Sequence, residues 1–353
     1  MVYPVLILYK KVVTMLKFTR VFAIIFLIAS AFSCSQRNAR TADADVPGID
    51  SLALRLKELN LKIASDPNND KLYLERANVY LLEGKTDSAL RDVFFAIDIN
   101  DQNPDHYVAL ADVYLAMGNP DKSMDGLNKS LQIDPVHIDA LLRKGRLYMI
   151  MRNYQQCYQT IDQLLQIDQV NPVAYFVKGF AHLEQGDTTA AIRNFRIAAE
   201  QDQAYFDPYL QLGMVYSAMK NPLAAEYLKI AINLRPMALE PYYQLALFFQ
   251  ENGNVEKAIK TYENILKIDP LHQFSLYNLG YINLVYLQDF EKGADYFTQV
   301  TEINPQYAEA FYNRGYCFEL SGNPDQAKKD YQKTLEIEVN YQKAIDGLNR
   351  LEK

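Results

Sequence analysis

The sequence is poor in the residues from which metal sites, disulfides and catalytic centres are built. Its 353 residues include three cysteines, four histidines and no tryptophan. None of the histidines has a cysteine, histidine or carboxylate partner at the spacing that zinc ligands require. A Gly-x-Ser-x-Gly elbow, a Walker loop and a Gly-x-Gly-x-x-Gly fingerprint are also missing. We therefore expect no metal, no cofactor and no catalytic residue, and we interpret the chain as a non-enzyme.

The sequence also lacks a cluster of positive charge. Its net charge is −7, and the lysines and arginines are not gathered into a run. A nucleic-acid partner needs a basic patch, so this class of partner is not expected.

What the sequence does contain is a unit of 34 residues that repeats from Asp70 to Tyr341. Apolar residues at helical spacing stand on both sides of a turn in each unit, and a proline closes four of them, at Pro135, Pro236, Pro270 and Pro305. Five units have glycine at the turn: Gly84, Gly118, Gly186, Gly253 and Gly322. A fixed period of this length indicates a stacked array of helix–turn–helix hairpins rather than a closed globule.

Aligned on the turn, the units form columns of constant residue size. Their first residues are Asp70, Pro104, Ile138, Pro172, Phe206, Leu239, Gln273 and Ala308. The fourth residue is large and apolar in every unit, and the eighth is always alanine or glycine. A small residue opposite a large one suits close packing of antiparallel helices. We expect a bulky residue at Gly213 to overpack the hairpin by about 1–3 kcal/mol.

These columns resemble the tetratricopeptide repeat family over about three quarters of the chain. The resemblance implies an all-α fold, an α-solenoid wound as a right-handed superhelix of about eight helix–turn–helix repeats at 70–341. Residues 342–353 are expected to form a capping helix. One residue is lost near 220–222 and one is gained near 287–289, so we expect irregular structure there. Cys157 and Cys317 are too many repeats apart for a disulfide and are expected to be buried.

The amino terminus resembles the signal peptide of a bacterial lipoprotein. After a second candidate start at Met15, two basic residues precede an apolar run at 21–32, which is shorter than the ~20 residues that a membrane span needs. Small residues then lead to Cys34, as in the lipobox, whose cysteine becomes the lipid-modified first residue. We expect residues 1–34 to be this signal peptide and Cys34 to carry the lipid. The alternative is an ordinary cleaved signal, or an uncleaved anchor.

Two further segments connect this signal to the repeats. Residues 35–50 are polar and contain a Pro-Gly pair, so they are predicted to form a flexible tether. Residues 51–67 regain helical spacing and are predicted to form a leading helix that packs on the first repeat.

In the tetratricopeptide family the first helix of each repeat lines a concave groove. Here the fifth and ninth residues of the later units are apolar or aromatic, and their sixth residues are amides that could hydrogen-bond an extended peptide. The predicted partner-binding residues are Phe176, Phe180, Leu210, Met214, Tyr243, Leu247, Tyr277, Asn278, Tyr281, Tyr312, Asn313 and Tyr316. An exposed aromatic stripe marks a binding surface, and the alternative is that neighbouring helices cover these rings. A chaperone-tail carboxylate clamp is not expected, because Leu74 and Asp139 stand where it needs lysine.

The sequence therefore predicts a lipid-anchored scaffold of the bacterial cell envelope, facing the periplasm or the cell surface. It would bind a protein or peptide partner in its groove for envelope assembly or regulation. One alternative is a structural protein that forms homo-oligomers through the groove or an open end. The other is an accessory protein that binds carbohydrate or peptidoglycan, because stacked tyrosines suit sugar rings.

Overall fold

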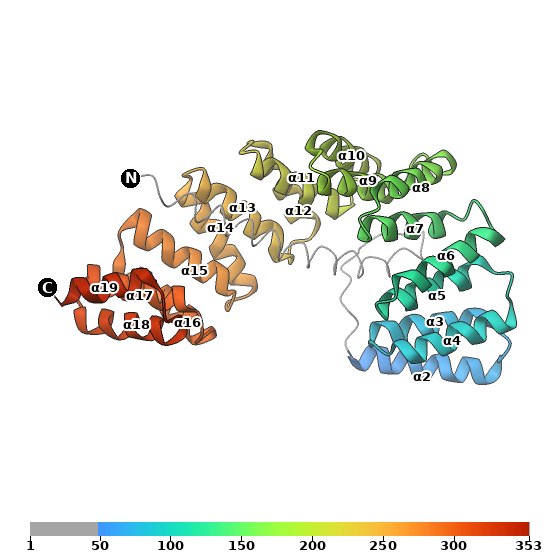
Figure 1. Cartoon of the computed structure of the whole chain (residues 1–353), viewed down its shortest axis with the longest axis horizontal. Helices are drawn as coiled ribbons and strands as arrows, with labels where there is room; N and C mark the ends of the chain where they lie inside the picture. The colour runs from blue at the N-terminus through green and yellow to red at the C-terminus, as the bar shows by residue number, and fades with distance from the viewer. Residues whose placement is uncertain (1–48, 353) are drawn as a thin grey trace. The chain divides into compact units, whose positions relative to one another are not determined.

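The computed structural model describes residues 49–352, and the regular structure of these residues is entirely helical. The predictions for the signal peptide and Cys34, and for the tether up to residue 48, lie outside the described residues. The described chain divides into two compact units, at 49–201 and 202–352. Figure 1 shows that each is a succession of paired helices.

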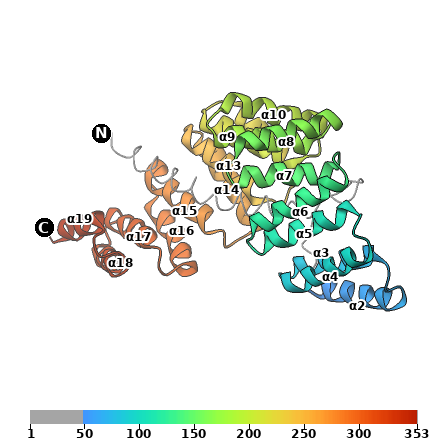
Figure 2. The same ribbon diagram turned by 45° about the vertical axis from the view of Figure 1, so that its right-hand side comes forward.

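The first unit consists of one leading helix and four hairpins. Helix α2 (Ile49–Ser65) packs on α3, as both views of the chain show (Figure 2). The hairpins are α3 (Asp70–Leu82) with α4 (Thr86–Ile99), α5 (Pro104–Ala116) with α6 (Pro120–Ile133), α7 (Ile138–Ile150) with α8 (Tyr154–Ile167), and α9 (Pro172–Glu184) with α10 (Thr188–Gln201).

The second unit consists of four more hairpins and a terminal helix. The hairpins are α11 (Phe206–Ala218) with α12 (Leu223–Leu234), α13 (Leu239–Glu251) with α14 (Val255–Ile268), α15 (Gln273–Ile282) with α16 (Phe290–Ile303), and α17 (Ala308–Leu320) with α18 (Pro324–Ile337). A π-helix, η2 (Asn283–Leu287), continues α15, and α19 (Gln342–Leu351) packs on α18.

The described chain is thus an all-α solenoid of eight helical hairpins, which confirms the predicted fold class and repeat number. Each first helix begins at the residue that the columns give as the start of its repeat. The leading helix differs from its predicted bounds of 51–67, since α2 begins at Ile49 and ends at Ser65. Its end has a local cause, because Pro67 disfavours the helical conformation at Asp66.

Close approach of the two helices in a hairpin depends on the alanine and glycine column. A Cβ atom added at Gly145 would lie 2.5 Å from Ile161 Cδ1, and one added at Gly213 would lie 2.5 Å from Leu228 Cγ. Carbon atoms in ordinary contact are about 3.5–4.0 Å apart. The expectation that a small residue faces a large one across each hairpin is confirmed at these positions.

The turns need a left-handed residue between the two helices. All five turn glycines have φ between 72° and 83°. The same position is held by Arg152, Lys220 and Gln288 in three other repeats, with φ of 58°, 54° and 55°. Side chains with a Cβ are strained in this conformation, so these turns carry a cost that the glycine turns avoid.

The two breaks in the repeat length produce two local irregularities, as predicted. In the fifth repeat α12 has 12 residues, whereas the second helices α6 and α14 have 14. In the seventh repeat the extra residue is taken up by η2 and by the left-handed Gln288. The amide of Asp289 then donates to the carbonyl of Asn283 at 2.9 Å, and α16 begins at the next residue.

Histidines cap two of the first helices, with opposite effects on their pKa values. His137 Nδ1 accepts from the amide of Ala140 at 3.2 Å, and its Nε2 lies 3.0 Å from Asp105 Oδ1. This hydrogen bond to Asp105 raises the pKa of His137. His272 Nδ1 accepts from the amide of Ser275 at 3.3 Å. Burial lowers the pKa of His272.

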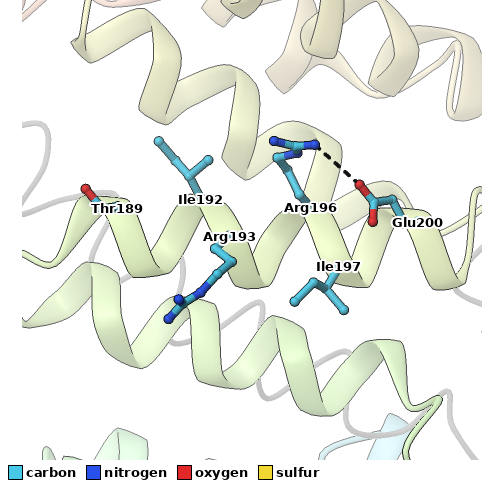
Figure 3. A pocket seen from close by; sticks show the side chains of 6 residues that line it. All are labelled: Thr189, Ile192, Arg193, Arg196, Ile197 and Glu200. Atoms are coloured by element: carbon cyan, nitrogen blue, oxygen red, sulfur yellow. Dashed lines mark ion pairs between the residues drawn. The ribbon is translucent and has the colours of Figure 1, made fainter.

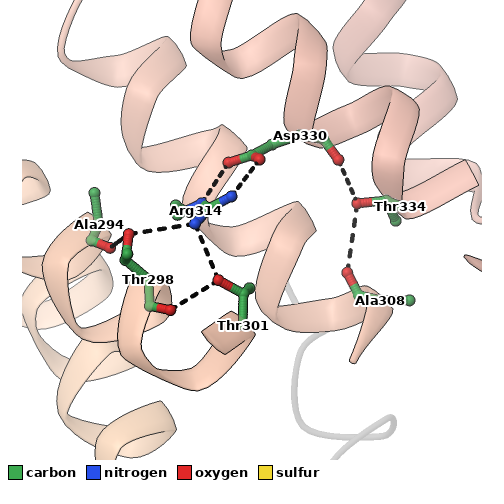
Figure 4. A network of polar contacts seen from close by, with 7 residues as sticks. All are labelled: Ala294, Thr298, Thr301, Ala308, Arg314, Asp330 and Thr334. Atoms are coloured by element: carbon green, nitrogen blue, oxygen red, sulfur yellow. Dashed lines mark hydrogen bonds and ion pairs between the residues drawn. The ribbon is translucent and has the colours of Figure 1, made fainter. Parts of the chain in front are cut away.

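Paired charges join the two helices of the first and last hairpins. Arg314 donates from Nε and Nη2 to the two carboxylate oxygens of Asp330, both at 2.7 Å (Figure 4). Its Nη1 also donates to Thr301 Oγ1 of α16 at 3.0 Å. Arg76 binds Asp92 in the same way in the first hairpin, again at 2.7 Å. Such bidentate bonds satisfy a carboxylate that is removed from water.

Candidate binding face

The predicted partner-binding residues fall on both compact units. Phe176 and Phe180 lie on α9 of the first unit. The other ten lie on α11, α13, α15 and α17 of the second unit, where they occupy the fifth, sixth and ninth positions of the repeats. We call these ten residues the first-helix face: Leu210, Met214, Tyr243, Leu247, Tyr277, Asn278, Tyr281, Tyr312, Asn313 and Tyr316.

The ninth position is the most regular part of this face. Met214, Leu247, Tyr281 and Tyr316 are all half-buried, so each keeps part of its side chain in contact with solvent. These residues therefore remain candidates for partner contact.

Two predicted contact residues lie below the surface. Phe176 is 7 % exposed, and its ring packs 5.5 Å from that of Phe195 on α10. Asn313 is 8 % exposed. Phe176 therefore belongs to the core of its hairpin, and Asn313 acts within the face rather than on it. Sequence alone does not reveal this, because burial at these positions depends on how closely the neighbouring helices approach.

Hydrogen bonds between successive repeats hold part of the face in place. Asn313 Nδ2 donates to the Tyr277 hydroxyl at 2.8 Å, and Asn278 Nδ2 donates to the Tyr243 hydroxyl at 3.2 Å. Two side-chain amides of the predicted ladder thus donate hydrogen bonds to the phenol groups of the preceding repeat. Each of these bonds fixes an amide and a tyrosine ring relative to each other, so this part of the face is ordered without a bound partner.

Two tyrosines outside the fifth, sixth and ninth positions of the repeats extend the face along one edge. Tyr307 directly precedes α17 and Tyr341 directly precedes α19. The ring of Tyr307 stacks on that of Tyr277 at 5.3 Å, and the ring of Tyr341 lies 5.3 Å from that of Tyr312. The sequence does hold a signal for them, because both precede the first residue of a helix, one repeat apart in the same column.

The phenols of this region stay neutral at ordinary pH. Burial raises the pKa of Tyr243 to about 12. It also raises the pKa values of Tyr277, Tyr307 and Tyr341, and the negative charge of Glu309 adds to the shift at each of these three residues. The rings therefore present uncharged aromatic surface with a carboxylate beside them.

The ninth positions of the first three repeats are polar: Asn78, Asp112 and Arg146. Asp112 accepts hydrogen bonds from Arg143 Nε, with both oxygens at 2.9 Å, and burial raises the pKa of Asp112 despite this pairing. Arg146 is 7 % exposed, and its Nε has no hydrogen-bond partner among the residues that the structure describes. The ninth column thus changes from polar residues in the first three repeats to apolar and aromatic residues in the later ones.

Elsewhere among residues 49–352, the cysteines, the carboxylates and the surface hollow offer no comparable site. Cys157 and Cys317 are fully buried, and burial raises the pKa of each thiol to about 12, so both stay protonated. Within 49–352 no group of three or more histidines, cysteines and carboxylates could hold a metal ion. A shallow hollow of about 380 Å³ lies along α10, lined only by side chains of that helix such as Arg193 and Arg196 (Figure 3).

Among the residues that the structure describes, no helix combines the length and the apolar character that crossing a bilayer requires.

The hairpin array and the aromatic face together define a repeat scaffold, a class of protein that presents stacked helices to a partner. Models of the tetratricopeptide repeat match residues 105–137, 239–270, 275–307 and 308–341. The chain therefore contains tetratricopeptide repeats. Proteins of this kind are generally non-enzymatic and typically serve protein–protein interaction.

Comparison with known proteins supports the same fold. The chain is 36 % identical over 84 residues to the photosystem I assembly protein Ycf3 of Acaryochloris marina, a match that covers 23 % of this chain and 50 % of that protein. The chain thus spans about half the length of this curated relative.

Two solved structures share the fold. One is the C-terminal part of a repeat protein from Cytophaga hutchinsonii, with a TM-score of 0.59, 19 % identity, and coverage of 67 % of this chain and 98 % of that one. The other is pilF of Pseudomonas aeruginosa, with a TM-score of 0.50, 23 % identity, and coverage of 60 % and 96 %.

Proposed function

We propose that this protein is a lipid-anchored scaffold of the bacterial cell envelope that binds a protein or peptide partner on its first-helix face. The observation that carries the binding proposal is the half-buried ninth column of the second unit, with Tyr281 and Tyr316 among its members. A tyrosine with one apolar face and one polar tip is the type of residue that dominates protein interfaces.

The packing around these rings favours binding by a preformed surface. The hydrogen bonds from Asn278 and Asn313 hold two tyrosines of the face in fixed orientations. A surface that is already ordered loses little conformational entropy when a partner binds. The assembly role named for Ycf3 agrees with such a scaffold, and assembly of an envelope component is the role we propose here.

Crosslinking in cells, followed by mass spectrometry of the captured proteins, tests the face. We expect Tyr281→Ala with Tyr316→Ala to lose the specific partners while the circular dichroism of the helices stays unchanged. Phe94→Ala is the matched control, because it removes an exposed aromatic ring from the second helix α4. Capture of the same partners by the double variant would show that the face is not the docking site.

The anchor rests on the residues before α2 and needs its own test. The mass of the mature amino terminus should correspond to a chain that begins at a lipid-modified Cys34. Cys34→Ala should move the protein out of the membrane fraction without changing the helical content of the repeats. A mature chain that begins elsewhere, or that carries no lipid, would contradict the anchor and leave the docking face unaffected.

A further inference from the structure

The first helices of the second unit carry an excess of negative charge. Helices α11, α13, α15 and α17 carry five carboxylates, on Asp207, Glu240, Glu251, Glu309 and Glu319. Their one basic residue is Arg314, which is bound to Asp330 of α18. Apart from Lys220 in a turn, the lysines of these hairpins lie on the second helices, where nine carboxylates balance them: Lys229, Lys257, Lys260, Lys267, Lys292, Lys328, Lys329 and Lys333.

The first unit shows no such bias. Its helices α3, α5, α7 and α9 carry acidic and basic residues in equal number, and several of them pair with each other or with the second helices. The acidic character is therefore specific to the helices that carry the first-helix face. Three of the acidic residues on these helices, Asp207, Glu240 and Glu309, are the second residue of their helix and so recur along one edge.

At one place on this edge three phenols gather near a carboxylate. Tyr277 lies on α15, Tyr307 and Glu309 lie at the start of α17, and Tyr341 precedes α19. The Tyr277 hydroxyl is hydrogen-bonded to Glu309, and its ring stacks on Tyr307. Glu309 follows Tyr307 by two residues, and its charge adds to burial in raising the pKa of each of these phenols.

The adjoining rings already receive cations from the chain itself. Lys343 Nζ lies 5.8 Å from the centre of the Tyr312 ring, and the guanidinium of Arg350 lies 5.8 Å from that of Tyr316. Both cations come from α19. A cation within about 6 Å of a ring centre is attracted by the negative face of the ring.

We infer that Tyr277, Tyr307, Tyr341 and Glu309 form a subsite for a lysine or arginine side chain of a peptide that lies along the first-helix face. This inference rests on the proposed docking function and adds the chemistry of the partner. The rings attract the cation through their faces, and Glu309 supplies the opposite charge in a half-buried setting. The recurring carboxylates at Asp207 and Glu240 extend the match to a partner segment with basic residues.

Selection from a random peptide library displayed on phage, with the full chain as target, tests this inference and needs no identified partner. We expect the selected peptides to share a lysine or arginine at one position. Replacement of that residue by glutamine should weaken binding about tenfold. Because the chain contains no tryptophan, the fluorescence of a single tryptophan in the synthetic peptide reports binding directly.

Matched variants connect the effect to the subsite. Glu309→Gln and Tyr341→Leu should weaken the basic peptide and leave the glutamine peptide unchanged, whereas Tyr341→Phe keeps the aromatic face and should bind normally. Glu302→Gln removes an exposed carboxylate from the second helix α16 and serves as the charge control.

The outcomes separate the two proposals. Peptides without a shared basic residue that still depend on Tyr281 would overturn the cationic subsite and keep the docking face. Failure to select any peptide, or peptides whose binding ignores Tyr281→Ala, would overturn both.

Discussion

Gly213 offers the sharpest test of how the hairpins pack. In Gly213→Ala the new methyl carbon would lie 2.5 Å from Leu228 Cγ and 2.6 Å from its Cδ2. Contacts between carbons are about 3.5–4.0 Å, so Leu228 would have to retreat by about 1 Å. Leu228 is fully buried, so the atoms packed around it oppose this movement. The overpacking should cost about 1–3 kcal/mol, which exceeds the ~1 kcal/mol that alanine gains over glycine in a helix.

A double-mutant cycle turns this expectation into a measured coupling. Leu228→Ala alone should cost about 2–5 kcal/mol because it opens a cavity. In the double variant the methyl group of residue 213 fills part of that cavity, so the combined loss should be at least ~1 kcal/mol smaller than the sum. Urea unfolding of the full chain gives the total, and hydrogen exchange localises the effect, because repeat arrays can unfold in parts.

Two results would refute this reasoning. Stabilisation of the chain by Gly213→Ala, at the full helix-propensity gain, would mean that Leu228 moves at no cost. Additivity of the two substitutions within about 0.5 kcal/mol would mean that the sites do not touch, since that is how independent sites behave.

The turns, the caps and the charge pairs give three more tests. Lys220→Gly should raise the melting temperature, since it relieves about 1 kcal/mol of left-handed backbone strain. Gly118→Ala should lower the melting temperature by a similar amount. Melting temperatures equal to that of the unaltered protein would contradict this strain. The stability contributed by His137, whose pKa is raised, is present below about pH 6.5 and lost as the pH rises, and that of His272, whose pKa is lowered, is lost as the pH falls below that value. Replacing each by asparagine, which keeps the cap, should therefore change the pH dependence of unfolding in opposite directions. Arg314→Met leaves a buried carboxylate unpaired and should cost about 3–5 kcal/mol in urea unfolding, whereas a loss below about 1 kcal/mol, the value of an exposed pair, would show that the pair is effectively solvated.

The features that could be predicted from the sequence are those that recur in every repeat. Helix starts, hairpin packing and the two irregular repeats follow from columns in which eight copies agree, so errors at single positions cancel. The surroundings of the candidate binding residues were predicted only in part. The burial of Phe176 and the hydrogen bond from Asn313 to Tyr277 depend on the rotation between successive helices. An alignment of the repeat sequences does not give this rotation. Tyr307 and Tyr341 were not predicted, because they lie in the connections between helices rather than at the fifth, sixth or ninth position of a repeat.

The π-helix at Asn283–Leu287 shows how this chain tolerates a change in its own length. An inserted residue in an ordinary helix would rotate every following side chain by about 100°. Here one widened turn and the left-handed Gln288 absorb the insertion before Phe290, so the next helix still meets its partner in register. Tyr277 and Tyr312 therefore stay in the same column although the chain between them is one residue longer. This corner is a place where the gene can gain or lose a codon without disturbing the surface that follows.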